Sequence, residues 1–294
     1  MERYNVIMPI VEADISVAIF NIPYILANLE PQKIYIIANK SIEDFFKSID
    51  RCYFVDEDSL YDGMNYNSIK NIVIERCGSQ ERTGWYFQQF LKMAYAFNSK
   101  DRYYLLWDAD TIPLKKISLF DVANRPVFTL RTEYHRPYFD VIERIIGISK
   151  CVDCSFISEH MVIDKEIMIE LIKKIEENNK INGKTFYEKV LNSIDVKELP
   201  LSGFSEFETY GTYTCTYYPD KYQFRQLKTC RQAKRLLGDM RDEKTLKWAS
   251  NSFDTISFEK TDVQYKKGRI VKLRIVQKFC SMKLLIKILF RYLY

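Results

Sequence analysis

The chain has 294 residues, 47% of them hydrophobic and 28% charged, and carries a formal net charge of +5. This profile predicts a globular α/β protein with one large domain or two small ones and an ample core. It excludes a membrane-spanning helix, which needs about 18 uninterrupted apolar residues, and the seven scattered cysteines argue against a disulfide framework. Since the N-terminus also lacks the apolar run of a signal peptide, we expect a cytoplasmic protein.

The N-terminal part of the chain alternates strand-like and helix-like runs. We predict strands at residues 5–9, 33–38 and 52–55, and helices at residues 15–29 and 42–49. Pro23 should kink or interrupt the first helix, and Ser41 can cap the second. Strands and helices in alternation are typical of a parallel sheet that is covered by helices.

The following part of the chain continues this pattern. We predict strands at residues 103–107, 128–131 and 155–163, and helices at residues 85–97, 165–177 and 185–194. The helix at residues 165–177 is the clearest, because its apolar residues recur on one face opposite its charged ones. No repeat or long linker interrupts the chain, so we expect one domain over residues 1–263, followed by a tail at residues 264–294.

The most informative feature is the triplet Asp108-Ala109-Asp110, which follows a buried strand. Such a strand delivers two carboxylates to the edge of a sheet, and Pro113 keeps it from continuing. Mg²⁺ and Mn²⁺ prefer oxygen ligands and are often shared with substrate phosphates, so a diphosphate, as in a nucleotide-sugar, could supply the missing ligands. A solvated turn at a strand end is the alternative interpretation.

A second group of polar residues precedes this strand. Gly84 marks a junction between a loop and a helix, where free backbone N–H groups favour phosphate, and Arg82 lies beside it. Gln88, Gln89 and Lys92 can share one face of the helix, because residues three and four apart are neighbours. We predict a helix that faces a ligand, against the alternative of an ordinary helix with polar outer positions.

Three further residues downstream could carry chemistry. His160 could be a metal ligand, an acceptor-binding residue or a hydrogen-bonded core histidine. Glu206 and Glu208 point the same way if the backbone is extended, but diverge if Ser205 caps a helix there. Either carboxylate could act as general base, and surface glutamates are the alternative.

Cys151 and Cys154 have metal or redox spacing, but no second cysteine pair supports such a site.

Taken together, these residues resemble a bacterial family of glycosyltransferases of the GT-A type, from loci for capsule and surface polysaccharide. Four segments in order carry the resemblance, namely residues 82–89, 107–113, 159–161 and 205–211. The resemblance implies a Rossmann-like α/β/α sandwich with a mostly parallel central sheet. It also implies transfer of a sugar from a nucleotide-sugar, by default a UDP-sugar, to a glycan or a lipid-linked oligosaccharide.

The same resemblance assigns roles to individual residues. Asp108 and Asp110 would bind Mn²⁺ or Mg²⁺, and His160 and Tyr210 would bind the acceptor. The nucleotide-sugar would contact a larger set, namely Pro9, Arg82, Gln88, Gln89, Lys92, Trp107 and Asp108. Glu206, or else Glu208, would deprotonate the acceptor hydroxyl for direct displacement with inversion.

The tail differs from the body in charge. Residues 264–294 hold nine Lys and Arg and no Asp or Glu, which leaves the body at −4. A basic amphipathic helix of this kind can bind an anionic membrane surface, and a last helix packed on the domain is the alternative. Nucleic acid is disfavoured because the tail has no recognisable reader motif.

Two other functions compete with sugar transfer. A sugar-phosphate nucleotidyltransferase also uses paired carboxylates and a metal, but residues 8–20 lack the glycines of its phosphate loop. A non-catalytic protein that binds a membrane surface would not need the Asp-x-Asp triplet.

Overall fold

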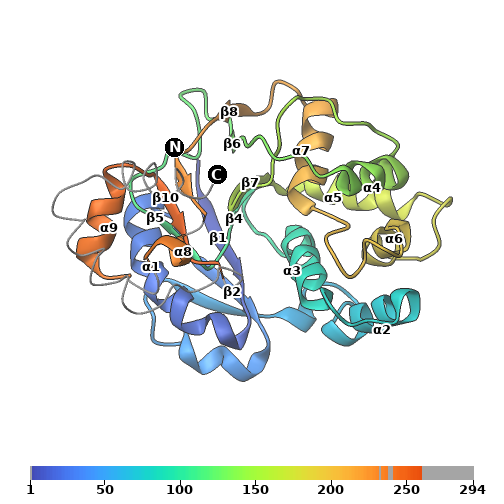
Figure 1. The fold of residues 1–294 in the computed structure, drawn as a ribbon, viewed down its shortest axis with the longest axis horizontal. Coiled ribbons are helices and arrows are strands. Elements are labelled where there is room, and N and C mark those ends of the chain that lie inside the picture. Colours follow the sequence, from blue (N-terminus) through green and yellow to red (C-terminus); the bar gives the residue numbers. More distant parts are fainter. Residues whose placement is uncertain (1, 232, 238–240, 260–294) are drawn as a thin grey trace. The chain divides into compact units, whose positions relative to one another are not determined.

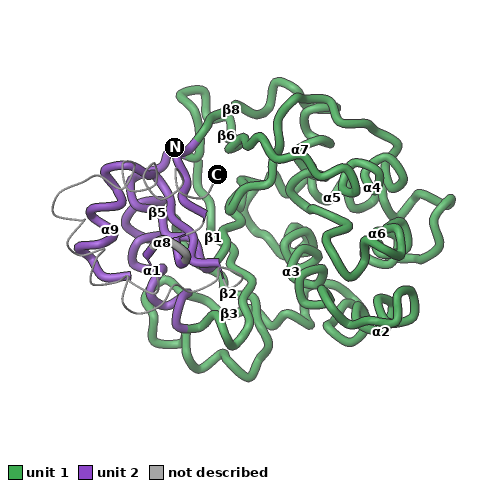
Figure 2. Tube along the Cα trace, in the orientation of Figure 1, with its two compact units in different colours: residues 1–15, 31–108, 119–226 green, residues 16–30, 109–118, 227–294 purple. Residues whose placement is uncertain are grey.

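The computed structural model describes residues 2–231, 233–237 and 241–259 (Figure 1). The chain forms two compact units (Figure 2). Unit 1 comprises residues 1–15, 31–108 and 119–226, and unit 2 comprises residues 16–30, 109–118 and 227–294. The tail predicted for residues 264–294 lies outside the described residues. Among the helices that are described, none has the length and apolar character to cross a membrane.

Unit 1 is built on a five-stranded sheet in the order β3-β2-β1-β4-β7. Its strands are β1 (Tyr4–Pro9), β2 (Ile34–Ala38), β3 (Cys52–Asp56), β4 (Tyr103–Trp107) and β7 (His160–Asp164). The first four are parallel, and β7 runs antiparallel to β4. Every residue of β1, β4 and β7 is buried, which explains why these strands are almost continuously apolar. The predicted mostly parallel α/β fold is therefore confirmed.

Six helices of unit 1 share one hydrophobic core with the sheet. They are α2 (Tyr66–Cys77), α3 (Thr83–Ala94), α4 (Arg136–Ile146), α5 (Lys165–Glu176), α6 (Phe186–Ser193) and α7 (Glu206–Tyr217). The sheet contributes alternate residues such as Ile7, Tyr104 and Leu106 to this core, so the helices cover one of its faces (Figure 1). The apolar face predicted for the helix at 165–177 is buried as expected.

The strand directions determine which residues meet at the edge of the sheet. Parallel strands end on the same side, so Pro9 at the end of β1 and Asp108 after β4 lie along one edge. Because β7 is antiparallel, its first residue, His160, pairs with Trp107, the last residue of β4. Ligands of open α/β sheets bind outside the carboxyl ends of the strands, so this is the edge to inspect for a site.

Three of the predicted elements differ from the observed ones. The helix predicted at 42–49 is observed as a 3₁₀ helix, Lys40–Phe45. It begins earlier than predicted because Asn39 and not Ser41 caps it, accepting a hydrogen bond from the Ser41 N–H at 3.1 Å. The strand predicted at 128–131 is β6 (Val127–Thr129), which pairs with β8 (Gln223–Arg225). The strand predicted at 155–163 begins only at His160, since Ser155 instead forms an isolated bridge with Arg131.

Unit 2 has its own small core. Its elements are most of α1 (Ile15–Leu29), β5 (Thr111–Pro113), β9 (Thr229–Cys230), α8 (Ala233–Leu237), α9 (Glu243–Ser250) and β10 (Thr255–Ser257). The three strands form a sheet in the order β5-β10-β9, and Ile112, Leu246 and Ile256 lie in the core beside it. The interruption predicted at Pro23 does not occur, because α1 continues through it with Pro23 exposed.

Two asparagines of α1 fix the segment that follows Asp108 in the chain. The Asn21 side chain donates to the carbonyl oxygens of Ala109 and, at 3.2 Å, of Thr111. The Asn28 side chain donates to the Pro113 carbonyl at 2.7 Å. The backbone around Asp110 is therefore held by side chains of its own unit, in addition to the β5–β10 pairing.

Candidate functional site

A buried ion-pair triad connects three elements at the carboxyl edge of the central sheet. Lys92, in the last turn of α3, places its Nζ 2.8 Å from Asp108 Oδ1 and 2.9 Å from Glu206 Oε1. The Lys92 side chain is only 6% exposed, as is that of Glu206, whereas that of Asp108 is 31% exposed. Burial lowers the pKa of the Lys92 ammonium, but the charges of Asp108 and Glu206 outweigh this and raise that pKa above its ordinary value.

The two glutamines of α3 contact backbone groups around this triad. Gln89, one turn before Lys92, accepts a hydrogen bond from the Glu206 N–H through its Oε1 at 3.0 Å. Gln88 donates to the Pro9 carbonyl at the end of β1, at 3.3 Å. The structure thus places the Gln88 side chain at the end of β1, and the side chains of Gln89 and Lys92 at the start of α7.

The two glutamates of α7 diverge. Ser205 caps the helix by accepting a hydrogen bond from the Glu208 N–H at 3.2 Å, so the helical alternative of the sequence analysis is the observed one. Glu206 turns to Lys92. The Glu208 carboxylate is fully buried and accepts hydrogen bonds from the Ser155 hydroxyl and, at 2.9 Å, from the Phe156 N–H. Burial raises its pKa.

His160 belongs to a buried cluster beside the strand end. Its ring stacks on Trp107, with centroids 4.8 Å apart, and its Nε2 lies 3.0 Å from the Thr129 hydroxyl. Burial, together with the nearby Arg225 and Arg131 guanidinium groups, lowers the pKa of His160 well below its ordinary value, so the ring is neutral. This is the environment of the third alternative, a hydrogen-bonded core histidine.

Sequence reasoning missed the two arginines of this cluster. Arg131 pairs with the Glu159 carboxylate at 2.7 Å, and Arg225 donates to Thr129 at 3.3 Å. The Glu159 carbonyl in turn accepts a hydrogen bond from the Asp108 N–H at 2.9 Å, which fixes the backbone of the triplet. No local motif marks these arginines, because Arg225 is placed by the pairing of β8 with β6 and Arg131 by an isolated bridge to Ser155.

Two other predicted residues have contrasting environments. Tyr210 is fully buried, and its hydroxyl bonds to the Asp164 N–H at 2.8 Å and to the Tyr222 hydroxyl at 2.6 Å. A hydroxyl so enclosed has no surface for an acceptor, and the structure gives Tyr210 a place in the core instead. Arg82 is exposed and lies over the Trp85 ring, just before an α3 N-terminus that has no side-chain cap.

The triplet supplies two carboxylates, the ligand type that a hard divalent cation prefers. Asp108 uses one carboxylate oxygen for Lys92, and its other oxygen has no hydrogen-bond partner among the described residues. Asp110, two residues on and in unit 2, accepts a hydrogen bond from the Thr111 hydroxyl at 3.3 Å. In the described part of the chain no cluster of three metal-binding side chains occurs.

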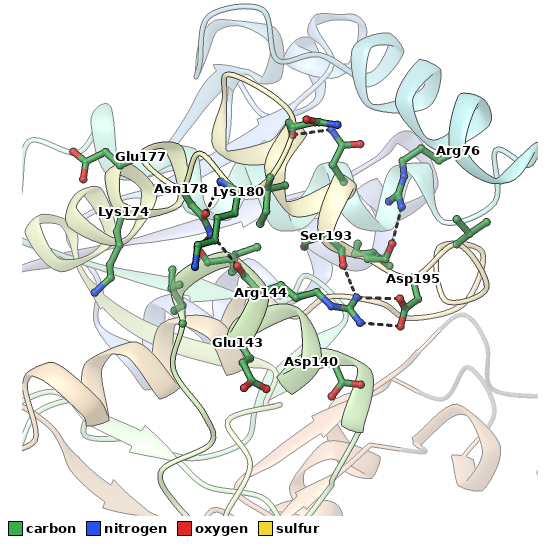
Figure 3. A pocket seen from close by; sticks show the side chains of 18 of the residues that line it. Arg76, Asp140, Glu143, Arg144, Lys174, Glu177, Asn178, Lys180, Ser193 and Asp195 are labelled. Atoms are coloured by element: carbon green, nitrogen blue, oxygen red, sulfur yellow. Dashed lines mark hydrogen bonds and ion pairs between the residues drawn. The ribbon is translucent and has the colours of Figure 1, made fainter.

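A separate hollow of unit 1, with a volume of about 1350 Å³, is lined by α4, α5, α6 and adjoining loops (Figure 3). Within it, Arg144 donates to the Ser193 carbonyl at 2.7 Å and pairs with Asp195 at 3.1 Å, while Arg136 pairs with Asp140 at 3.5 Å. These two arginines are thus paired with carboxylates of the same wall. None of the predicted site residues lines it.

Several solved structures are similar to this one. The apo form of the bifunctional glycosyltransferase WbbM has a TM-score of 0.46 at 10% identity, with 89% of this chain and 46% of that chain covered. The galactosyltransferase LgtC with donor and acceptor sugar analogues has a TM-score of 0.42 at 8% identity, covering 95% and 98%. The apo form of the glycosyltransferase GlyE from Streptococcus pneumoniae TIGR4 has a TM-score of 0.43 at 10% identity, covering 99% and 64%. The chain thus spans less than half of the WbbM chain.

Comparison of sequences gives a family. No curated protein matches the chain. A family of unknown function, DUF6492, matches residues 35–284, which include every predicted site residue except Pro9. Because this match takes in most of the sequence, the chain belongs to the DUF6492 family.

Proposed function

We propose that this protein is a metal-dependent glycosyltransferase that moves a sugar from a nucleotide-sugar to a glycan or lipid-linked acceptor. The observation that supports this most is the position of Asp108, which follows β4 at the carboxyl edge of the sheet and is bound to Lys92. The other oxygen of Asp108 has no hydrogen-bond partner among the described residues, and Asp110 follows two residues later in the chain, so the two carboxylates suit a cation shared with a diphosphate.

In this proposal Asp108 and Asp110 hold Mn²⁺ or Mg²⁺, which as a Lewis acid would neutralise charge on the departing nucleoside diphosphate. Lys92 holds Asp108 in place and adds positive charge on the same side. Arg82 and the uncapped N-terminus of α3 would attract the phosphates. Gln88 of α3, whose side chain contacts the Pro9 carbonyl at the end of β1, would lie beside the nucleotide.

Glu206 is the carboxylate that we propose as general base. One of its oxygens accepts from Lys92, and the carboxylate has no other hydrogen bond among the described residues, so it retains capacity for an acceptor hydroxyl. Glu208 is less suited to this role because it is fully buried and already accepts hydrogen bonds from Ser155 and Phe156. Direct displacement with Glu206 as base would invert the sugar carbon.

The cellular location of the proposed reaction is inferred from the sequence alone. The resemblance to enzymes of capsule and surface-polysaccharide loci and the basic residues 264–294 suit an acceptor at an anionic membrane surface. Co-sedimentation with anionic vesicles should be lost when residues 264–294 are deleted, and unchanged binding would contradict this part of the proposal.

Thermal unfolding with nucleotides tests the function. We expect UDP, GDP or CDP, or one of their sugars, to raise the melting temperature only when Mn²⁺ or Mg²⁺ is present, since a ligand at a hundred times its Kd stabilises by about 2.7 kcal/mol. In Asp110→Asn this metal-dependent shift should disappear.

Asp220→Asn is the matched control, because Asp220 is an exposed carboxylate outside the site. It should keep the full shift. If folded wild-type protein shows no shift with any nucleotide and either metal, the glycosyltransferase proposal fails and a non-catalytic binding function gains support. A shift with nucleoside triphosphates alone would favour the nucleotidyltransferase alternative.

A further inference from the structure

Three cysteines of unit 1 meet at a point that the proposed reaction does not use. Cys151 and Cys154 lie in the segment between α4 and β7, and Cys215 lies on α7. In the sequence, Cys151 and Cys154 are separated by two intervening residues and have no second cysteine pair to support a site. The fold adds Cys215, which is more than 60 residues away in the chain.

The contacts favour one pair within this group. The Cys151 thiol is exposed and donates to the Thr212 carbonyl of α7 at 3.8 Å. Thr212 and Cys215 are three residues apart and so lie on one face of α7. The Cys215 thiol is half-buried on that face, and both Cys151 and Cys154 interact with it electrostatically.

We propose that Cys151 and Cys215 form a reversible disulfide bond, which makes this a redox modification site of the protein. The oxidant that we name is a small disulfide such as glutathione disulfide. Both thiols are free in the structure, and Cys151 already contacts the turn of α7 that carries Cys215.

The exchange is balanced in two steps. Cys151, as the exposed thiol, loses its proton and attacks one sulfur of glutathione disulfide, giving a mixed disulfide and one glutathione thiolate. The Cys215 thiolate then attacks the Cys151 sulfur and releases the second glutathione. Two electrons and two protons pass from the protein to two glutathione molecules. Burial raises the pKa of Cys215 to about 12, so the second step should accelerate as the pH rises.

The bond would join the segment between α4 and β7 to the helix α7. Cys154 directly precedes Ser155 and Phe156, which bind the Glu208 carboxylate. A link from Cys151 to Cys215 would therefore attach this segment to α7 at two places. This inference does not depend on the proposed glycosyl transfer, because its readout is the covalent state of the thiols.

Peptide mapping of the full-length protein tests the proposal. After incubation with glutathione disulfide and alkylation of free thiols, we expect a peptide pair linked through Cys151 and Cys215, which disappears on addition of dithiothreitol. Cys151→Ser should abolish the link, and because Cys151 is exposed this change should leave the fold intact. Cys77→Ser, another free thiol of unit 1, is the matched control and should keep it.

The outcomes separate the possible pairings. A link between Cys151 and Cys154, or between Cys154 and Cys215, would overturn the proposed pair. Alkylation of both Cys151 and Cys215 after exposure to the oxidant would overturn the site altogether. Retention of the link in Cys154→Ser would support the proposal.

Discussion

Lys92 carries one positive charge between two carboxylates and has almost no contact with solvent. Glu206, at the start of α7, lies 114 residues from Lys92 in the chain, and Asp108, after the end of β4, lies 16 residues from it. Breaking a buried ion pair by removing one partner is costly, because the remaining charges lose their compensation.

We therefore expect Lys92→Met to lower the free energy of unfolding by about 3–5 kcal/mol, as measured by urea denaturation. Adding Glu206→Gln to this variant should recover part of the loss, since the double variant removes one of the two unpaired charges. Lys47→Met, at an exposed ion pair, should leave the midpoint unchanged. Equal midpoints for Lys92→Met and Lys47→Met would show that the triad contributes nothing to stability.

The two glutamates of α7 should respond differently to the same chemical change. Glu206→Gln should reduce the rate of sugar transfer by about 10²-fold or more, the usual contribution of a general base. Its metal-dependent thermal shift with nucleotide should persist, which separates loss of the base from loss of donor binding. Glu208→Gln should keep the transfer rate per folded molecule. Full activity of both variants would exclude this role for either residue.

At the scale of single residues, the sequence predicted which residues come together but not how deeply they are buried. Asp108, Lys92 and Glu206 were all assigned to the site, yet their mutual pairing depends on the docking of α7 against α3. His160 and Tyr210 look like ligand-binding residues because they are polar and lie near the motifs. Their burial follows from the neighbouring Trp107 and Tyr222, which no local pattern connects with them.

At the scale of elements, α7 shows how one small residue permits close packing. A Cβ atom added to Gly211 would overlap the ring of Phe156. Phe156 also donates its N–H to Glu208, so its position is fixed both by the core and by a hydrogen bond. The close approach of this segment to α7 therefore requires glycine at position 211.

Gly211→Ala should destabilise the protein by about 1–3 kcal/mol, the usual cost of overpacking, although alanine is the better helix former. Gly84→Ala is the matched control, because Gly84 is also helical and the nearest atom to an added Cβ, on Tyr66, is 4.0 Å away. It should leave stability unchanged or slightly higher. The free energy of unfolding of each variant is measured by urea denaturation. If Gly211→Ala is as stable as the wild type, Phe156 can move aside.

Elements with a strong apolar pattern were predicted well, and those fixed by side-chain contacts were not. The helix α5 follows directly from the spacing of its apolar residues, and β4 from its continuous apolar run. The helix α2 was not predicted because only Ile69 and Val73 are buried in it, although Asn65 and Gly78 cap its two ends. The irregular path before β7 depends on hydrogen bonds to Glu208, which lies 52 residues away.

At the scale of the whole molecule, the neutral His160 makes stability depend on pH. Its pKa in the folded state lies well below 6.5, chiefly because of burial, whereas the unfolded chain takes up a proton below that pH. Stability should therefore be constant above pH 6.5 with respect to this group, and should fall as the pH drops below it. The slope is at most about 1.4 kcal/mol per pH unit.

Replacing His160 by Gln should flatten this slope between pH 6.5 and pH 5, as measured by urea denaturation at a series of pH values. The difference in stability between the variant and the wild type should stay constant between pH 7 and pH 8, which serves as the internal control. Parallel curves for the two proteins over the whole range would show that His160 takes up a proton without unfolding.

The division of unit 2 into three separate segments has a consequence for synthesis on the ribosome. The hydroxyls of Thr111 in β5 and Ser257 in β10 are 2.7 Å apart in space but 146 residues apart in the chain. At translation rates of about 5–20 residues per second, β5 emerges roughly seven to thirty seconds before its partner strand exists. During that interval Ile112 has no sheet to enter, while the strands β1 to β4 of unit 1 are already available to pair. The apolar segment at β5 is thus one that nascent-chain chaperones would need to shield.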